Sequence, residues 1–182
     1  MSTPDDLPVS EYAFPGPLRD LLVGAILAGE KTTTTFLLRE LEIDDESMPA
    51  VGDRAAVIDS AGIPVGIETV EEVRVVRLGD VDLAHALGEG EGYASVADWR
   101  AGHESFWHGR EYREYVDDPE FRVDDDTLAV LVRFSFRAGR PTVGYGTRPG
   151  RRAADSTTAP EIRQRSRRIR ARGLESGGFR KL

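Results

Sequence analysis

The regular spacing of apolar residues ends at Phe136, and this break limits which part of the chain can fold. Residues 1–136 carry 11 basic and 29 acidic side chains, a net charge of −18. Residues 137–182 carry 13 basic and 3 acidic side chains, a net charge of +10. A segment so poor in apolar residues buries too little surface to offset the entropy lost on ordering. We therefore predict a folded, acidic body followed by a disordered basic tail over residues 137–182.

The arginine-rich tail predicts contact with RNA or DNA phosphates, which would weaken steeply as the salt concentration rises. Three other interpretations stay open: a solvated extension, contact between the tail and the acidic body, and residues added by a misassigned stop codon. An acidic body is a poor surface for a long nucleic-acid strand, so we expect any nucleic acid to bind locally in a cleft.

The composition excludes several classes of protein. The 182 residues are enough for one core, and a chain without cysteine has no disulfide, thiol nucleophile or thiolate metal site. Only three histidines are present, so we predict no metal and no cofactor. No apolar run approaches the roughly 20 residues of a membrane span, and the acidic start lacks the features of a signal peptide. We expect a cytoplasmic protein with no membrane partner; its oligomeric state stays open.

Helical patterns occur in two parts of the body. An apolar stripe at helical spacing predicts an amphipathic helix that ends at Gly29, where a left-handed cap is expected. The stripe consists of Leu18, Leu21, Leu22, Ala25 and Ile26. We expect a second helix to begin within residues 32–35. Asp80 is predicted to cap a short helix, and Ser95 a longer one with Asp98 as its capping partner.

Alternating apolar residues predict a sheet in the middle and at the end of the body. A three-residue link at residues 60–62 predicts a hairpin, and we expect Ile63, Val65 and Ile67 to face the core. The last strong strand is residues 128–136. Helices, a meander, further helices and a closing strand predict an α+β fold whose sheet curls into a small barrel.

Lys31 is an unusual residue for this body. Of 24 basic residues only two are lysines, and the other, Lys181, lies in the tail. A desolvated lysine can lose its proton, which arginine does not, so Lys31 is a candidate general base. Threonines occupy positions 32–35; at a helix start they would offer an anion cradle, and one hydroxyl could act as a nucleophile. The alternative is a surface lysine followed by capping threonines.

The segment Gly88-Glu89-Gly90-Glu91-Gly92 suits neither a helix nor a strand. Its glycines allow close backbone approach, and its carboxylates can hold a cation, an amine or a ribose hydroxyl, or set the protonation of Lys31. The helix after it carries Trp99, Arg100 and His103, and an aromatic residue beside a cleft can stack on a base. The alternatives are a solvated acidic turn and an aromatic stripe within the core, with His103 a structural residue.

Together these residues resemble the ASCH domain family of the PUA-like superfamily, in particular its larger bacterial members. Gly29-Glu30-Lys31-Thr32-Thr33-Thr34 resembles the G-x-K-T-x-T element of that family, and the likeness continues through residues 48–53, 89–92 and 95–106. The resemblance covers residues 14–136 and implies a PUA-like small β-barrel with flanking helices. Residues 1–13 would then be an N-terminal extension, 14–136 the ASCH domain and 137–182 the tail.

The resemblance implies RNA or a modified nucleoside as the ligand. Short bacterial members hydrolyse the amide of N4-acetylcytidine, and their catalytic lysine, threonine and glutamate fall by position on Lys31, Thr34 and Glu91. In that mechanism Lys31 is kept partly neutral and takes a proton from Thr34 or from water. The resemblance also leaves open a non-catalytic RNA-binding module and a metal-independent ribonuclease, so activity as a hydrolase is one of three alternatives.

The implied substrate-binding residues are Thr32, Glu89, Trp99, Arg100 and His103. The chain departs from the family pattern at Tyr93, where an aspartate usually follows Gly92. That change bears on whether the loop holds the same ligand.

Overall fold

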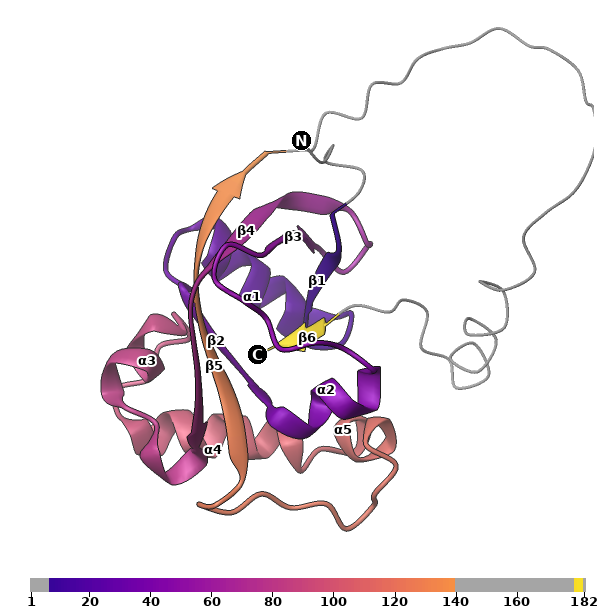
Figure 1. Ribbon diagram of the computed structural model, residues 1–182, viewed down its shortest axis with the longest axis vertical. Coiled ribbons are helices and arrows are strands. Elements are labelled where there is room, and N and C mark those ends of the chain that lie inside the picture. The colour runs from indigo at the N-terminus through magenta and orange to yellow at the C-terminus, as the bar shows by residue number, and fades with distance from the viewer. Residues whose placement is uncertain (1–6, 140–178, 182) are drawn as a thin grey trace, which may run out of the picture.

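The computed structural model describes residues 7–139 and, for the backbone alone, residues 179–181 (Figure 1). The remainder of the predicted tail, residues 140–178, lies outside the described residues, as do residues 1–6 and 182. The strands are β1 Val9–Tyr12, β2 Thr33–Leu37, β3 Arg54–Ile58, β4 Pro64–Arg77, β5 Leu128–Ala138 and β6 Phe179–Lys181. The helices are α1 Pro17–Leu27, α2 Leu38–Asp44, the 3-10 turn η2 Leu78–Asp80, α3 Leu83–Gly88, α4 Val96–Trp107 and α5 Arg110–Tyr115.

The strands form one mixed sheet in the order β2-β5-β4-β3-β1-β6. The pairs β2–β5, β5–β4 and β4–β3 are antiparallel, whereas β1 is parallel to both β3 and β6. The sheet curls until β6 at one edge contacts β2 at the other. Figure 1 shows α3, α4 and α5 gathered at one end of the long strands β4 and β5. The predicted α+β fold with a curled sheet is confirmed.

The first strand lies within the segment that the sequence analysis assigned to an N-terminal extension. Val9 and Ser10 of β1 pair with Ala56 and Val57 of β3, so the folded domain begins before residue 14. Likewise, β5 continues to Ala138, two residues beyond the predicted end of the body. The strand β6 was not predicted, because its three residues carry too little pattern to be separated from a polar tail.

The predicted start of the second helix within residues 32–35 is wrong. Thr33 to Leu37 form strand β2, which pairs with β5 from Thr33↔Arg133 to Leu37↔Ala129, and α2 begins only at Leu38. Threonine is β-branched and stiff, so a run of threonines favours a pleated strand over a helical turn. The anion cradle expected at a helix start in this segment is therefore absent.

The most buried residues of β4 lie on the face opposite to the predicted one, although Val65 packs partly buried against the main core as predicted. Gly66, Glu68 and Val70 face inward, while Ile63, just before the strand, is 46% exposed. A Cβ at Gly66 would lie 2.5 Å from the Arg137 carbonyl oxygen, so the sheet needs glycine there. Apolar alternation misled the prediction because the inward residues include a glycine and a glutamate.

Several local predictions are confirmed. The chain between β3 and β4 turns as a hairpin at Gly62, and Gly29 after α1 has a φ of +75°, as a left-handed cap requires. The Ser95 hydroxyl caps α4 by accepting a bond of 3.0 Å from the Asp98 backbone N–H. The short helix α3 is capped by Asp82, two residues beyond the predicted Asp80.

A buried arginine fixes the turn between β1 and α1. Arg19 is 1% exposed, and its guanidinium donates to the carbonyl oxygens of Tyr12 (3.0 Å) and Ala13 (2.8 Å). It also lies 3.2 Å from Glu11 Oε1. These bonds hold the end of β1 and the Tyr12 side chain in place.

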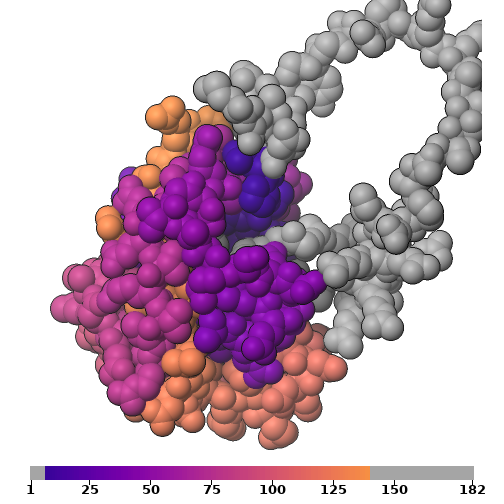
Figure 2. All heavy atoms as spheres, in the orientation of Figure 1, coloured from indigo at the N-terminus to yellow at the C-terminus, as the bar shows by residue number. Residues whose placement is uncertain are grey.

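The helices surround the curled sheet and cover its core. On the face of the molecule drawn in Figure 2, α2 forms a distinct protrusion between β1 and α5. None of the helices within residues 7–139 combines the length and the apolar character needed to cross a bilayer.

Replacing Arg19 tests the importance of this turn. Arg19→Met keeps the length of the side chain but removes its three bonds, so we expect the free energy of unfolding to fall by about 3 kcal/mol or more. Arg110→Met is the matched control, because the Arg110 side chain is 87% exposed and pairs with Glu114 on the surface, where a loss below about 1 kcal/mol is expected. Urea unfolding measures both. Equal losses would contradict the assigned role of Arg19.

Candidate functional site

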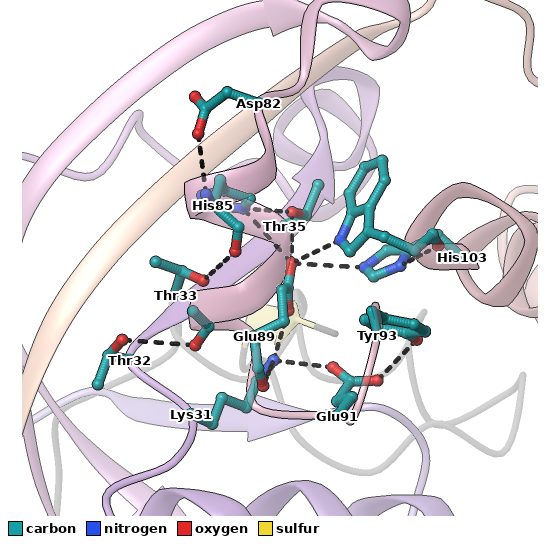
Figure 3. Close-up of polar contacts among 12 residues, drawn as sticks. Lys31, Thr32, Thr33, Thr35, Asp82, His85, Glu89, Glu91, Tyr93 and His103 are labelled. Carbon is teal, nitrogen blue, oxygen red and sulfur yellow. Dashed lines mark hydrogen bonds and ion pairs between the residues drawn. The ribbon is translucent and has the colours of Figure 1, made fainter. Parts of the chain in front are cut away.

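The candidate site is built around one buried ion cluster. Lys31 lies between α1 and β2, and its side chain is fully buried. Its Nζ donates to Glu89 Oε2 at 2.5 Å and to Glu91 Oε1 at 3.0 Å (Figure 3). The two glutamates differ in access, because the Glu89 side chain is 0% exposed and that of Glu91 is 15% exposed.

The glycines of the Gly-Glu segment bring both carboxylates to Lys31. Gly90 has a φ of +68°, and a Cβ there would lie 2.5 Å from the Lys31 backbone nitrogen. A Cβ at Gly88 would meet the Thr33 side chain at 2.8 Å, and the Thr32 backbone N–H donates to the Gly88 carbonyl at 2.7 Å. The loop therefore packs backbone against backbone on residues 30–33, which a residue with a side chain would prevent.

Glu89 is enclosed by polar groups from three elements. Its Oε1 accepts bonds from the Thr35 hydroxyl (2.7 Å) and from the Trp99 indole N–H (3.2 Å). The Nε2 atoms of His85 and His103 lie 3.4 and 3.5 Å from the same oxygen. Because Thr35 has one hydroxyl proton and gives it to Glu89, the contact of 2.8 Å between Thr35 and His85 requires His85 Nε2 to donate. Glu89 thus has its hydrogen bonds inside the protein and holds Lys31 in place.

The cluster keeps Lys31 charged. Burial alone would lower the pKa of the Lys31 ammonium, but the charges and hydrogen bonds of Glu89 and Glu91 raise that pKa above its ordinary value. Burial would likewise raise the pKa of Glu89, but the Lys31 charge holds it well below the usual range. The expectation that Lys31 is kept partly neutral is therefore wrong for this state of the protein.

Glu91 is the accessible carboxylate of the site. The Tyr93 hydroxyl donates to Glu91 Oε2 at 3.0 Å, while Lys31 binds the other oxygen, so both ends of the carboxylate are oriented. A Cβ at Gly102 would lie 2.5 Å from the Tyr93 hydroxyl, which shows how closely that side chain packs on α4. Burial and Glu91 raise the pKa of Tyr93, so this hydroxyl stays a donor. Tyr93, which departs from the family pattern, here supports Glu91.

The structure brings some of the other predicted residues to the site and separates the rest. Trp99 and His103 are buried, at 0% and 1% exposed, and their rings stack on each other with centroids 4.2 Å apart. They support Glu89 from the core and present no face on which a base could stack. Arg100 points away, to Glu104 (2.7 Å) and Asp125 (3.2 Å). Thr32 is exposed at the edge of the cluster, where its hydroxyl bonds the Gly88 carbonyl at 3.4 Å.

Thr34 lies on the opposite face of β2 from Thr33 and Thr35. The hydroxyls of Thr33 and Thr35 reach His85, so strand alternation directs the fully buried Thr34 to the barrel interior, the side of Phe36. Phe36 packs there with Val70.

A cavity of about 600 Å³ opens beside β1 and reaches the same interior. Its charged lining is acidic except for Arg54 and consists of Asp45, Glu46, Asp53 and Glu68, while Ser10 and Ser47 are neutral polar residues. Glu68 accepts a bond of 2.6 Å from the Tyr12 hydroxyl, and the Tyr12 ring centroid lies 5.9 Å from Lys31 Nζ. Glu68 and Tyr12 therefore link the cavity to the ion cluster.

Sequence reasoning missed the side chains that support the site from a distance. Tyr12 and Glu68 are 56 positions apart, and nothing local marks them as partners. Burial and the charge of Glu68 raise the pKa of Tyr12 well above its ordinary value, so its phenol stays neutral. Thr35 and His85 also gave no signal, because their roles depend on a pairing across 50 positions. Within residues 7–139, no group of three or more acidic or histidine side chains is placed to hold a metal ion.

A curled mixed sheet with flanking helices is the fold of the PUA-like class. The sequence matches the ASCH domain family over residues 10–136, and the chain belongs to that family.

One solved structure supports the family assignment, and a second shows the same fold. A crystal structure of an ASCH domain from Lactobacillus crispatus is 30% identical, with a TM-score of 0.56, over 65% of this chain and 71% of the other. A protein from Enterococcus faecalis is 20% identical, with a TM-score of 0.62, over 72% of this chain and 76% of the other. Among curated proteins, no sequence matches the chain.

The ion pair predicts how stability depends on pH. The pKa of Glu89 is lower in the folded protein than its ordinary value of 4.5, so its contribution to stability is present above that value. The contribution is lost as the pH falls through the folded-state pKa. Glu89→Gln should lower the free energy of unfolding near neutral pH by about 3–5 kcal/mol, since Lys31 loses its fully buried partner. The variant should also lose stability less steeply than the parent below 4.5.

Urea unfolding at neutral and acidic pH measures this effect. The double variant Lys31→Met/Glu89→Gln should be more stable than the sum of the two single changes predicts, because it removes both charges together. Additive losses would show that the two residues do not stabilise each other.

The loop geometry predicts a second, local effect. Gly90→Ala places a methyl group against the Glu30–Lys31 backbone at a positive φ, so the loop must move away from Lys31. Gly92 also has a positive φ, of +82°, but open space around it, so Gly92→Ala is the matched control for backbone strain alone. We expect Gly90→Ala to lower the melting temperature clearly more than Gly92→Ala. Equal shifts would contradict the close packing assigned to Gly90.

Proposed function

We propose that this ASCH-domain protein binds a modified nucleoside in the cleft and hydrolyses an amide on its base, as in N4-acetylcytidine. The observation that supports this proposal most is the buried Lys31, held by one enclosed glutamate and one accessible glutamate. Buried charges are expensive to maintain, and clusters of this kind gather at sites that move protons. The position of Lys31 and Glu91 in the family pattern supports the same reaction.

The cavity supports a nucleoside more than an RNA strand. Its volume of about 600 Å³ lies in the range of small-molecule sites. Four carboxylates and one arginine line it, and that balance repels a phosphodiester backbone but tolerates an uncharged nucleoside. A hydrolysis product with an exocyclic amine would also be accepted by carboxylate oxygens.

In the proposed reaction Glu91 and Glu89 have different roles. Glu91 takes a proton from a water molecule, and the water oxygen attacks the acyl carbon. The carbon–nitrogen bond breaks, Glu91 returns the proton to the leaving amine, and the acid is released. Lys31 orients Glu91 and balances its charge, while Glu89 fixes Lys31. Thr34 is fully buried on the interior face of β2 and is proposed to hold the acyl group.

The first measurement is the mass of a single-stranded oligoribonucleotide carrying one N4-acetylcytidine, together with the free nucleoside, after incubation with the protein. We expect loss of one acetyl group, faster from the nucleoside. Glu91→Gln should lower the rate by about 10²–10⁴-fold, the usual effect of removing a general base. Glu114→Gln on α5, an exposed glutamate, is the matched control and should retain the parent rate.

The other outcomes decide between the alternatives. Shorter fragments without added metal would identify a ribonuclease, and an unchanged but bound oligonucleotide would identify a binding module. An acetyl group attached to Thr34 in a single turnover would contradict water as the nucleophile. A rate for the nucleoside 5′-monophosphate equal to that for the nucleoside would contradict the role given to the acidic cavity.

A further inference from the structure

Strand β6 closes the gap between the two ends of the sheet. Without it the order would be β2-β5-β4-β3-β1, with β1 and β2 at opposite edges. Its backbone pairs in parallel with β1, in the register Ser10↔Phe179, Glu11↔Arg180 and Tyr12↔Lys181, and it also contacts β2. Residues 179–181 are thus inserted between the strands that carry the candidate site.

The same gap leads to the ion cluster. Ser10, which pairs with residue 179, lines the acidic cavity, and Tyr12, which pairs with residue 181, places its ring 5.9 Å from Lys31 Nζ. Figure 3 shows the yellow strand directly behind Lys31 and Glu89. A ligand that approaches Lys31 along β1 therefore meets the backbone of β6.

The pairing of β6 with β1 is short enough to be reversible. Three residues give only a few backbone hydrogen bonds, and among the described strands β6 pairs only with β1, although it also contacts β2. Charge favours its return, because the segment Phe179-Arg180-Lys181 is basic and the cavity beside it is acidic. The segment stays covalently joined to the folded body when it is undocked.

We propose that the groove between β1 and β2 is a strand-docking surface, and that its occupant is residues 179–181 of this same chain. When the strand is docked, it blocks the access of a ligand to Lys31. When it is undocked, a ligand can reach Lys31 along β1. The identity of that ligand rests on the proposed function, but the docking itself does not. The strand and the ligand then compete for one space. The apparent affinity of the protein for the ligand is therefore proportional to the fraction of molecules in which the strand is undocked.

Proline substitution in the full chain tests the docking. Alternate N–H groups of a strand face a given neighbour, and proline has none, so either Arg180→Pro or Phe179→Pro/Lys181→Pro removes the donors to β1. Arg172→Pro, outside the described residues, is the control for charge and for proline in the same part of the chain. Hydrogen–deuterium exchange of residues 9–12 should speed up in at least one β6 variant and stay unchanged in the control.

Oxidation by hydroxyl radicals reports whether the way to the site opens. Tyr12 is 0% exposed in the docked state, and we expect its oxidation to rise in the variant that exposes β1. Tyr112, 2% exposed in the main core, should stay protected in every variant. Unchanged exchange in β1, or unchanged oxidation of Tyr12, would overturn the proposal. Protection of β1 that depends on protein concentration would assign the strand to a second copy and overturn docking within one chain.

Binding of N4-acetylcytidine separates this inference from the proposed function. If β6 is docked about nine-tenths of the time, freeing the groove should tighten the apparent affinity about tenfold. Equal affinity in the parent and in a variant with an exposed β1 would overturn the competition and leave the proposed function intact. No binding by any variant, with β1 and Tyr12 exposed, would overturn the proposed function and leave the docking intact.

Discussion

The contact between Lys31 and Glu89 is the constraint on which the rest of the site depends. Both side chains are fully buried, and two charges taken out of water are tolerated only when each has its hydrogen bonds inside the protein. Glu89 obtains them from Thr35, Trp99 and its neighbours on α3 and α4. The pair therefore joins β2, the Gly-Glu loop and α4, and the loop needs Gly90 to bring its backbone close enough.

The difference in burial between Glu89 and Glu91 suits Glu89 to a structural role and Glu91 to the proposed chemical one. A carboxylate with several internal donors gains nothing from a ligand, so Glu89 is held as a fixed charge beside Lys31. Glu91 has one oxygen on Lys31 and the other on Tyr93, and its side chain is still 15% exposed. An oriented but accessible carboxylate can exchange a proton with water, which its buried neighbour cannot. In the proposed mechanism Lys31, charged between the two glutamates, positions Glu91.

The site residues that are unusual in the composition of this chain could be predicted from the sequence. Those whose role depends on contacts between distant strands could not. A lone body lysine and the alternating Gly-Glu segment were recognised from composition, and the structure places them in contact. The threonines were misread as a helix start, because capping and strand formation favour the same β-branched residue. Tyr12 and Glu68 meet only after the sheet has curled, and the inward face of β4 carries a glycine and a glutamate where apolar alternation pointed to isoleucine.

Charge connects the proposed ligand with the proposed occupant of the groove. The acidic lining of the cavity opposes a phosphodiester strand, accepts an uncharged nucleoside and attracts a basic peptide segment. A body with a net charge of −18 therefore attracts the basic segment 179–181 into the groove between β1 and β2, and no sequence-specific pocket is needed. On this view the positive charges of Arg180 and Lys181 favour docking of the segment on the acidic body. In the proposed competition a nucleoside without phosphate replaces the strand, because it brings no negative charge to the acidic groups beside the groove.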